Sequence, residues 1–154
     1  MRQLDLPPEL LAAIHAHARA TYPEECCGFL LSTPPADGPA GERRIVALAP
    51  APNRSSGERR RRFEIPPSEL RAAERRAEAA GRVVSGFYHS HPDHPAVPSS
   101  FDQEHAWPWY AYVIVASSAS GTPGAVGAFE LHPDRREFEE RPVRMAEAAL
   151  AGGA

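Results

Sequence analysis

The chain has 154 residues and a formal net charge of −3, with 20 acidic residues and 17 basic residues that are all arginines. This length suits one domain with a core large enough to enclose a cleft. The mildly negative charge argues against a general nucleic-acid-binding protein, and no apolar run approaches membrane-spanning length. The first ten residues, MRQLDLPPEL, lack the apolar centre of a signal peptide, so we expect a cytoplasmic protein without membrane contact.

The first half of the chain predicts two helices separated by strands. Helices are expected at residues 7–20 and 69–80, and strands at 28–32, 43–49 and 63–65. His15 and His17 on the first helix are expected at the surface. The polar segment 50–62 is expected to be a mobile loop, and Gly81 is a favourable end for the second helix.

The second half begins with the β-prone run 83–88, followed by a loop that three prolines make stiff. Ser99 or Ser100 offers an N-cap for a short helix through His105. Further strands are expected at residues 110–117, 127–131 and 137–143, the last two as a hairpin. This order predicts a mixed sheet with helices against it, an α/β sandwich. We expect one domain over residues 1–145 and a tail over 146–154, either helical or disordered.

The segment HSHPDHPAVPSSFD, residues 89–102, is the most informative part of the sequence. If the preceding strand continues, His89 and His91 point to one face and Ser90 to the other. Asp102 would lie in the first turn of the helix after Ser99. Two imidazole nitrogens and one carboxylate oxygen are a common catalytic zinc set, with one position left for water.

Each half of this pattern also has a structural explanation. A His-x-His pair alone is often a packed or surface pair, and Ser99 with Asp102 alone resembles a helix cap with a first-turn acid. The combination at this spacing after a strand favours metal binding.

The motif resembles the signature of the JAMM/MPN+ metallopeptidases: His, Ser or Thr, His, seven residues, Ser, two residues and Asp. That family also has a glutamate in a Pro-x-Glu-x-x-Gly stretch that leads into a strand. The stretch YPEECCGFLL, residues 22–31, is similar, and its spacing selects Glu25 over Glu24. Without the metal motif, Glu25 would be read as a solvated acid.

The resemblance implies a curved, mostly antiparallel mixed sheet flanked by helices, with a cytidine-deaminase-like layering and the metal at one edge. It implies one Zn²⁺ per chain, held by His89, His91 and Asp102. Glu25 would take the proton of a metal-activated water and deliver it to the leaving amine. Ser99 would donate a hydrogen bond to the developing oxyanion. The activity implied is hydrolysis of a peptide or isopeptide bond.

The substrate implied is a ubiquitin-like or sulfur-carrier protein, cleaved after its C-terminal Gly-Gly. The walls of its groove are expected from residues 50–65 and from Trp107, Trp109 and Tyr110. The main alternative is a non-catalytic MPN-type module that binds a ubiquitin-like protein. A DNA-repair-associated relative would carry an additional helical region, and a zinc nucleoside deaminase would need motifs that are absent from this sequence.

Other conspicuous residues receive structural roles. His94 and His105 are expected to lie outside the ligand set, because a fourth ligand would occupy the position that water needs. Cys26 and Cys27 are expected to pack as small apolar residues rather than to form a disulfide. Residues 59–62, four consecutive arginines, are expected to form a solvated loop face, with contact to an anion as the alternative.

Overall fold

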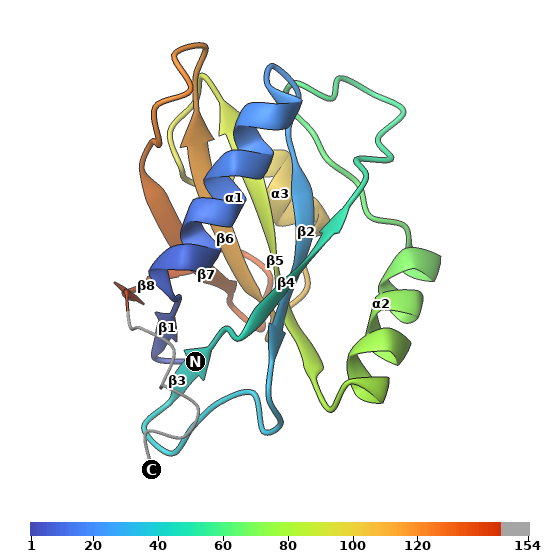
Figure 1. Ribbon diagram of the computed structural model, residues 1–154, viewed down its shortest axis with the longest axis vertical. Coiled ribbons are helices and arrows are strands. Elements are labelled where there is room, and N and C mark those ends of the chain that lie inside the picture. Colours follow the sequence, from blue (N-terminus) through green and yellow to red (C-terminus); the bar gives the residue numbers. More distant parts are fainter. Residues whose placement is uncertain (146–154) are drawn as a thin grey trace.

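The computed structural model describes residues 1–145, which form a six-stranded sheet, a small three-stranded sheet and three helices (Figure 1). The helices are α1 (Pro8–Thr21), α2 (Pro67–Ala79) and α3 (Ser100–His105). The strands are β1 (Gln3–Asp5), β2 (Cys27–Ser32), β3 (Glu42–Arg44), β4 (Ala47–Ala51), β5 (Val83–Pro92), β6 (Ala111–Ser117), β7 (Val126–Leu131), β8 (Phe138–Arg141) and β9 (Val143–Arg144). Within residues 1–145, no helix combines the length and apolar character that crossing a bilayer requires.

The large sheet has the strand order β4-β2-β5-β6-β7-β8. Strands β5 and β6 are parallel, and every other neighbouring pair in this sheet is antiparallel. The predicted mixed, mostly antiparallel sheet is therefore confirmed. Because β5 has a hydrogen-bonded strand on both sides, its side chains are held at fixed positions on the two faces.

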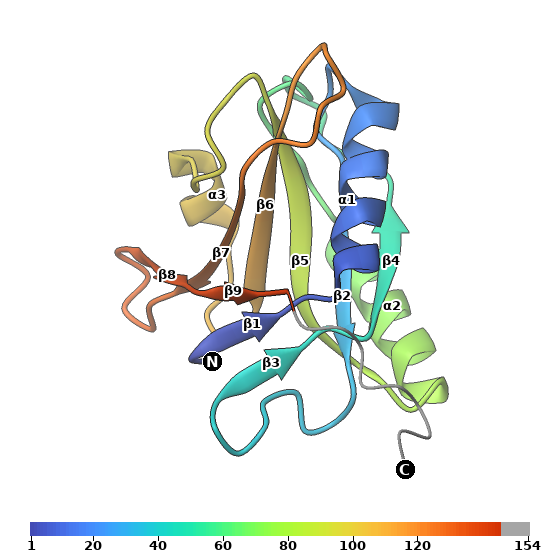
Figure 2. The same ribbon diagram turned by 60° about the vertical axis from the view of Figure 1, so that its left-hand side comes forward.

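Helices cover both faces of the large sheet, as Figure 2 shows, with α1 on one side and α3 on the other. Ile14 and Ala18 of α1 belong to the cluster that contains Tyr88, whereas Ala73 and Ala77 of α2 belong to the cluster that contains Phe87. Neighbouring residues of β5 thus point into separate cores, as strand alternation requires.

Gly28 of β2 lies opposite Tyr88 and has no room for a side chain. A Cβ atom there would approach the Tyr88 ring within 2.4 Å. The Tyr88 hydroxyl lies 2.8 Å from His17 Nδ1 on α1, so the ring is fixed from both sides. The glycine of the YPEECCGFLL stretch is therefore required by the packing of the strand that carries the two histidines.

The structure corrects several sequence-based predictions. The strand expected at 43–49 is split between two sheets, because the backbone N–H of Ile45 donates to β1 and that of Val46 to β2. The short strand expected at 63–65 is absent, and these residues form an irregular segment before α2. Strand β1 was not predicted. His15 is buried rather than at the surface. The tail predicted for 146–154 lies outside the described residues.

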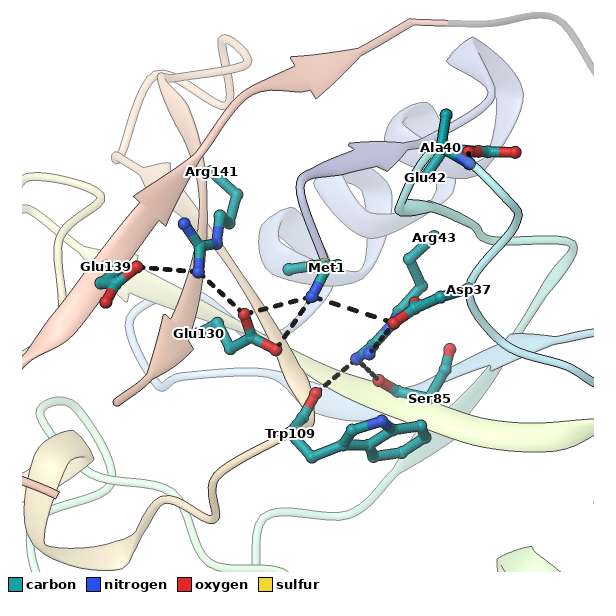
Figure 3. Close-up of polar contacts among 10 residues, drawn as sticks. All are labelled: Met1, Asp37, Ala40, Glu42, Arg43, Ser85, Trp109, Glu130, Glu139 and Arg141. Atoms are coloured by element: carbon teal, nitrogen blue, oxygen red, sulfur yellow. Dashed lines mark hydrogen bonds and ion pairs between the residues drawn. The ribbon is translucent and has the colours of Figure 1, made fainter. Parts of the chain in front are cut away.

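A buried arginine joins the small sheet to the large one. Arg43 of β3 has no exposed side-chain surface, and its Nε lies 2.6 Å from Asp37 Oδ1 (Figure 3). Its Nη1 donates to the backbone oxygens of Ser85 and Trp109, and its guanidinium stacks over the Trp109 ring. Ser85 lies on β5, and Trp109 lies two residues before β6. One side chain therefore holds the first part of β5 and the segment that leads into β6.

Arg43→Met should lower the free energy of unfolding by about 3 kcal/mol, because it leaves two carbonyls without donors and removes the partner of the half-exposed Asp37 carboxylate. Urea denaturation measures this. Arg44→Met on the same strand is the control, since Arg44 is exposed and its substitution should cost less than about 0.5 kcal/mol. Equal stability of the two variants would contradict this role for Arg43.

Candidate metal centre

Strand β5 and helix α3 bring three candidate ligands into van der Waals contact. The Nε2 atoms of His89 and His91 lie 3.1 Å apart. Asp102 Oδ2 lies 3.3 Å from His89 Nε2 and 3.1 Å from His91 Nε2. All three side chains are buried. The residues predicted to hold a metal thus form a nearly equilateral triangle of nitrogen and oxygen atoms.

This triangle fits one face of a tetrahedral ligand set. Ligand atoms about 2.0–2.1 Å from a shared zinc ion, at tetrahedral angles, lie about 3.3 Å from one another. The three observed separations are 3.1, 3.1 and 3.3 Å. The donor set and its spacing therefore suit a divalent cation with a fourth position open.

The backbone explains why Asp102 reaches the two histidines. Ser99 is the N-cap of α3, and its Oγ accepts a hydrogen bond from the Asp102 backbone N–H at 3.1 Å. In return, Asp102 Oδ2 accepts from the Ser99 backbone N–H at 2.9 Å. This reciprocal capping box holds the carboxylate at the start of the helix, and the same oxygen faces the imidazoles. The cap and the candidate ligand are therefore one arrangement.

Hydrogen bonding favours the metal-binding tautomer of His91. Its Nδ1 lies 2.9 Å from the backbone oxygen of Pro95, which can only accept, so Nδ1 carries the proton. The lone pair of a neutral ring is then on Nε2, which faces His89 and Asp102. A carbonyl partner of this kind is typical of metal-ligating histidines.

His89 is positioned by packing. Phe63 stacks on its ring at a centroid distance of 4.4 Å. Its Nδ1 is buried and has no hydrogen-bond partner within residues 1–145. Burial lowers the pKa of His89, although the nearby Asp102 raises it. A neutral imidazole is the form that a metal ion needs.

Electrostatics keep Asp102 ionised. Burial alone would raise the pKa of its carboxyl, but the nearby His89 and His91 rings and the hydrogen bond from the Ser99 backbone N–H lower it well below its usual range. A carboxylate that stays ionised at every ordinary pH is a suitable cation ligand.

Glu25 lies beside this triangle, in the segment between α1 and β2. One of its carboxylate oxygens and one ring nitrogen each of His89 and His91 lie within 4.8 Å of one another. Its Oε1 is buried without a hydrogen-bond partner in the described part of the chain. Burial, together with the charge of Asp102, raises the pKa of Glu25 to about 9. An unpaired carboxyl in this position is a candidate for handling protons next to a cation.

The loop between β4 and α2 holds Glu25 in place. The Glu25 backbone N–H donates to the Arg59 carbonyl at 2.8 Å. Asn53 Nδ2 donates to the carbonyls of Glu25 and Arg62, and its Oδ1 accepts from the backbone N–H of Glu64. Sequence reasoning expected groove walls from residues 50–65 but singled out neither Asn53 nor Phe63, and it also assigned Phe63 to a short strand. An asparagine in a polar loop has no sequence signal that sets it apart.

An apolar cavity of about 440 Å³ opens next to the stacked pair of Phe63 and His89. It lies between the loop before α2, the end of α3 and the sheet, and Trp107 is part of its wall. The expected groove walls are therefore partly present. Trp109 and Tyr110 do not line this cavity, and Trp109 instead packs on Arg43.

The remaining candidates lie around the triangle. Ser90 points to the other face, where its Oγ accepts from the Cys26 backbone N–H. The His105 ring stacks on that of Phe101, and its Nδ1 lies within hydrogen-bond distance of the Phe101 backbone oxygen. The His94 and His91 rings are arranged edge to face, with their centroids 6.1 Å apart. Both histidines are exposed, and their predicted exclusion from the ligand set remains a prediction.

The two cysteines are free and buried, as expected. Cys26 packs in the cluster under α1 and Cys27 in the cluster on the opposite face. Burial raises the pKa of both thiols, that of Cys26 to about 11. Burial thus keeps both thiols protonated at neutral pH, in keeping with their packing as small apolar residues.

Sequence comparison assigns the chain that forms this site to a known protein family. A profile describing prokaryotic homologues of the JAB domain matches residues 7–130, which include Glu25, both histidines and Asp102. This chain belongs to the prokaryotic JAB family. It is 36% identical over 148 residues to a protein named desampylase from Haloferax volcanii. This alignment covers 93% of this chain and 96% of the relative. It is also 37% identical over 91 residues to the tail tip assembly protein K of Escherichia phage N15, covering 31% of that protein.

Solved structures show the same fold for the JAB-family chain. A solution structure from Salinibacter ruber is 41% identical, with a TM-score of 0.70 over 96% of this chain and 93% of that one. A solution structure of a protein from Desulfitobacterium hafniense is 28% identical, with a TM-score of 0.78, and the match covers 95% of this chain and 94% of that one. A JAB1/MPN domain protein from Archaeoglobus fulgidus is 18% identical, with a TM-score of 0.54 over 92% and 98%, and supports the fold alone.

Glu25 predicts an unusual pH dependence for the metal-stripped protein. Its pKa in the folded chain, about 9, lies above its ordinary value of 4.5. A carboxyl that binds its proton more tightly when folded contributes its full stabilisation below about pH 4.5. This contribution is lost as the pH rises through about 9. Glu25→Gln is neutral throughout and should not lose stability in this way.

In EDTA, the wild type should therefore lose stability relative to Glu25→Gln as the pH rises. The unfolding free energy of Glu25→Gln minus that of the wild type should increase by more than about 1 kcal/mol between about pH 5 and pH 8. Chemical denaturation at the two pH values measures the difference. Glu24→Gln, at the exposed neighbour, should follow the wild-type curve. A Glu25→Gln variant that also follows it would show that Glu25 is not buried in a proton-retaining site.

Proposed function

We propose that this chain is a zinc-dependent hydrolase that cleaves the peptide or isopeptide bond after the C-terminal Gly-Gly of a ubiquitin-like or sulfur-carrier protein. The observation that carries the proposal is the triangle of His89, His91 and Asp102 with the unpaired carboxyl of Glu25 beside it. The family supports a hydrolase, and the name of the Haloferax relative denotes removal of a ubiquitin-like modifier.

His89, His91 and Asp102 would hold the cation. Two neutral imidazoles and one carboxylate leave a net positive charge on a bound Zn²⁺, which a fully thiolate set would not. When bound, the cation supplies Lewis-acid chemistry: it polarises a carbonyl and lowers the pKa of a water molecule towards neutrality.

Glu25 would accept the proton of the attacking water and then pass it to the leaving amine. A general base works best when its pKa lies near the operating pH. Burial and the neighbouring Asp102 carboxylate both raise the pKa of Glu25, and a bound cation would lower it again. The same carboxyl can thereby hold a proton in one step and release it in the next.

Ser99 would stabilise the oxyanion of the tetrahedral intermediate. Its Oγ already accepts from the Asp102 backbone N–H, so its own hydroxyl proton remains free to donate. The side chain is half-buried at the start of α3, next to the candidate ligand. A donor fixed by a helix cap requires little reorganisation during the reaction.

The site geometry also suits an extended tail. The apolar cavity beside Phe63 and Trp107 can take an apolar side chain of the segment that precedes the scissile bond. Two glycines at the bond itself would let the backbone approach the buried triangle closely, because they have no side chains that could clash. Main-chain pairing with a sheet edge is a common way to bind such segments.

Glu25→Gln should retain bound zinc and lower the rate of hydrolysis by about 10²–10⁴-fold, the usual contribution of a general base. The substrate is a ubiquitin-like protein joined through Gly-Gly to a fluorescent reporter, and elemental analysis measures the metal. Glu24→Gln is the matched control and should leave both quantities unchanged.

Two results would count against these roles. Wild-type turnover by Glu25→Gln would show that Glu25 does not handle the proton, and loss of zinc in this variant would make it a ligand. A wild-type protein that holds zinc and binds the ubiquitin-like protein without cleaving it would instead be a non-catalytic module.

A further inference from the structure

The loop between β4 and α2 carries a concentrated positive charge. Residues 54–62 contain five arginines and one glutamate. Since the whole chain has 17 arginines and 20 acidic residues, the remainder has 12 and 19. One short segment is thus strongly basic in an otherwise acidic protein. All five arginines are exposed.

The arginine run, defined here as Arg59–Arg62, is held at the rim of the candidate metal centre. At its start, the Arg59 carbonyl accepts from the Glu25 backbone N–H. At its end, the Arg62 guanidinium lies over Phe101, one residue before Asp102, at 4.8 Å from the ring centroid. The next residue, Phe63, stacks on His89. Figure 1 shows this loop in green between β4 and α2, at the end of the sheet where β2 begins.

Hydrogen bonds hold the backbone of this loop, although its five arginine side chains are exposed. Asn53 bonds the carbonyl of Arg62 and the N–H of Glu64, and Ser55 Oγ accepts from the backbone N–H of Gly57. Arg54 forms an ion pair with Glu69 at the start of α2. The expected mobility of this loop stays a prediction. These bonds define one backbone conformation from which the arginines project, and a loop held in this way lowers the entropic cost of binding a partner.

The charges of the arginine run are not neutralised within residues 1–145. None of its four guanidinium groups forms an ion pair there; Arg59 donates to the Ser55 carbonyl and Arg62 stacks on Phe101. Arg60 and Arg61 have no side-chain partner among the described residues. Guanidinium groups bind carboxylates in a bidentate geometry, so this pair is free to dock an acidic surface.

We propose that the arginine run docks an acidic patch on the folded body of the protein substrate, next to the tail that enters the candidate metal centre. This inference rests on the proposed function and names the chemistry of its substrate: clustered carboxylates beside the cleaved segment. A nucleic acid fits less well, because Glu58 precedes the run, the run itself contains no aromatic residue for base stacking, and the Phe63 ring that follows it is stacked on His89.

The test compares a charge-reversed pair with a matched pair elsewhere. Arg60→Glu with Arg61→Glu changes the two unpartnered side chains and leaves Arg59 and Arg62, which contact the site, intact. The control is Arg75→Glu with Arg76→Glu, two exposed arginines in the second half of α2. Both variants change the net charge equally.

The probes are an acidic ubiquitin-like protein fused through Gly-Gly to a reporter, and the same C-terminal tail as a free peptide. At low salt, the Arg60 and Arg61 variant should weaken binding of the folded probe and lower its kcat/KM by about tenfold or more. Hydrolysis of the free peptide should be unchanged. The control variant should stay within about twofold of the wild type on both probes, and added salt should abolish the difference.

Equal loss on the folded probe and the free peptide, or an equal effect of the control pair, would overturn the proposal. Tighter binding of an RNA oligonucleotide than of the acidic protein, lost in the same variant, would also overturn it. If the wild type hydrolyses neither probe, the proposed function fails, and the binding constants still decide whether the acidic patch docks on the arginine run.

Discussion

Three buried atoms with lone pairs, the Nε2 atoms of His89 and His91 and Oδ2 of Asp102, lie within 3.3 Å of one another. The proposed function depends on this close approach. A single proton on His89 Nε2 would have to serve both His91 Nε2 and Asp102 Oδ2. A divalent cation satisfies all three atoms at once, because it attracts each lone pair along its own direction.

The fold produces this crowding with ordinary backbone features. Strand alternation places two imidazoles on one face of β5, and the hydrogen bonds to β2 and β6 prevent that strand from shifting. A helix cap aims the carboxylate of Asp102. The loop before α2 fixes Glu25 by its backbone and His89 by the Phe63 ring. Each contact is common. The site forms because the neighbouring β5 and α3 meet two segments that are distant in sequence, the one that carries Glu25 and the loop before α2.

The sequence predicted the parts of the site that depend on local periodicity and on a fixed spacing. The positions of His89, His91 and Asp102 follow from a strand, a stiff loop and a capped helix, all of which the structure contains. Glu25 was found through its similarity to a family motif. Its surroundings were not predictable, because Asn53 and Phe63 act through contacts that span tens of residues. The roles of these residues in catalysis remain predictions.

The fold was predicted less completely at its edges. Strand β1 has only three residues and pairs in parallel with β3 and β9, so no local alternation announces it. The change of sheet at Ile45 depends on which strand lies opposite each amide, a long-range property. The buried Arg43 likewise could not be distinguished from the other sixteen arginines, because its burial follows from tertiary contacts with Asp37 and Trp109.

The most direct test of the central claim is X-ray absorption spectroscopy of the protein loaded with one equivalent of Zn²⁺. The account predicts a first shell of nitrogen and oxygen only, at about 2.0–2.1 Å, with the outer-shell scattering of two imidazoles. His89→Ala should reduce that scattering to one imidazole. A first shell containing sulfur at about 2.3 Å, or one without imidazole scattering, would place the metal elsewhere and contradict the account.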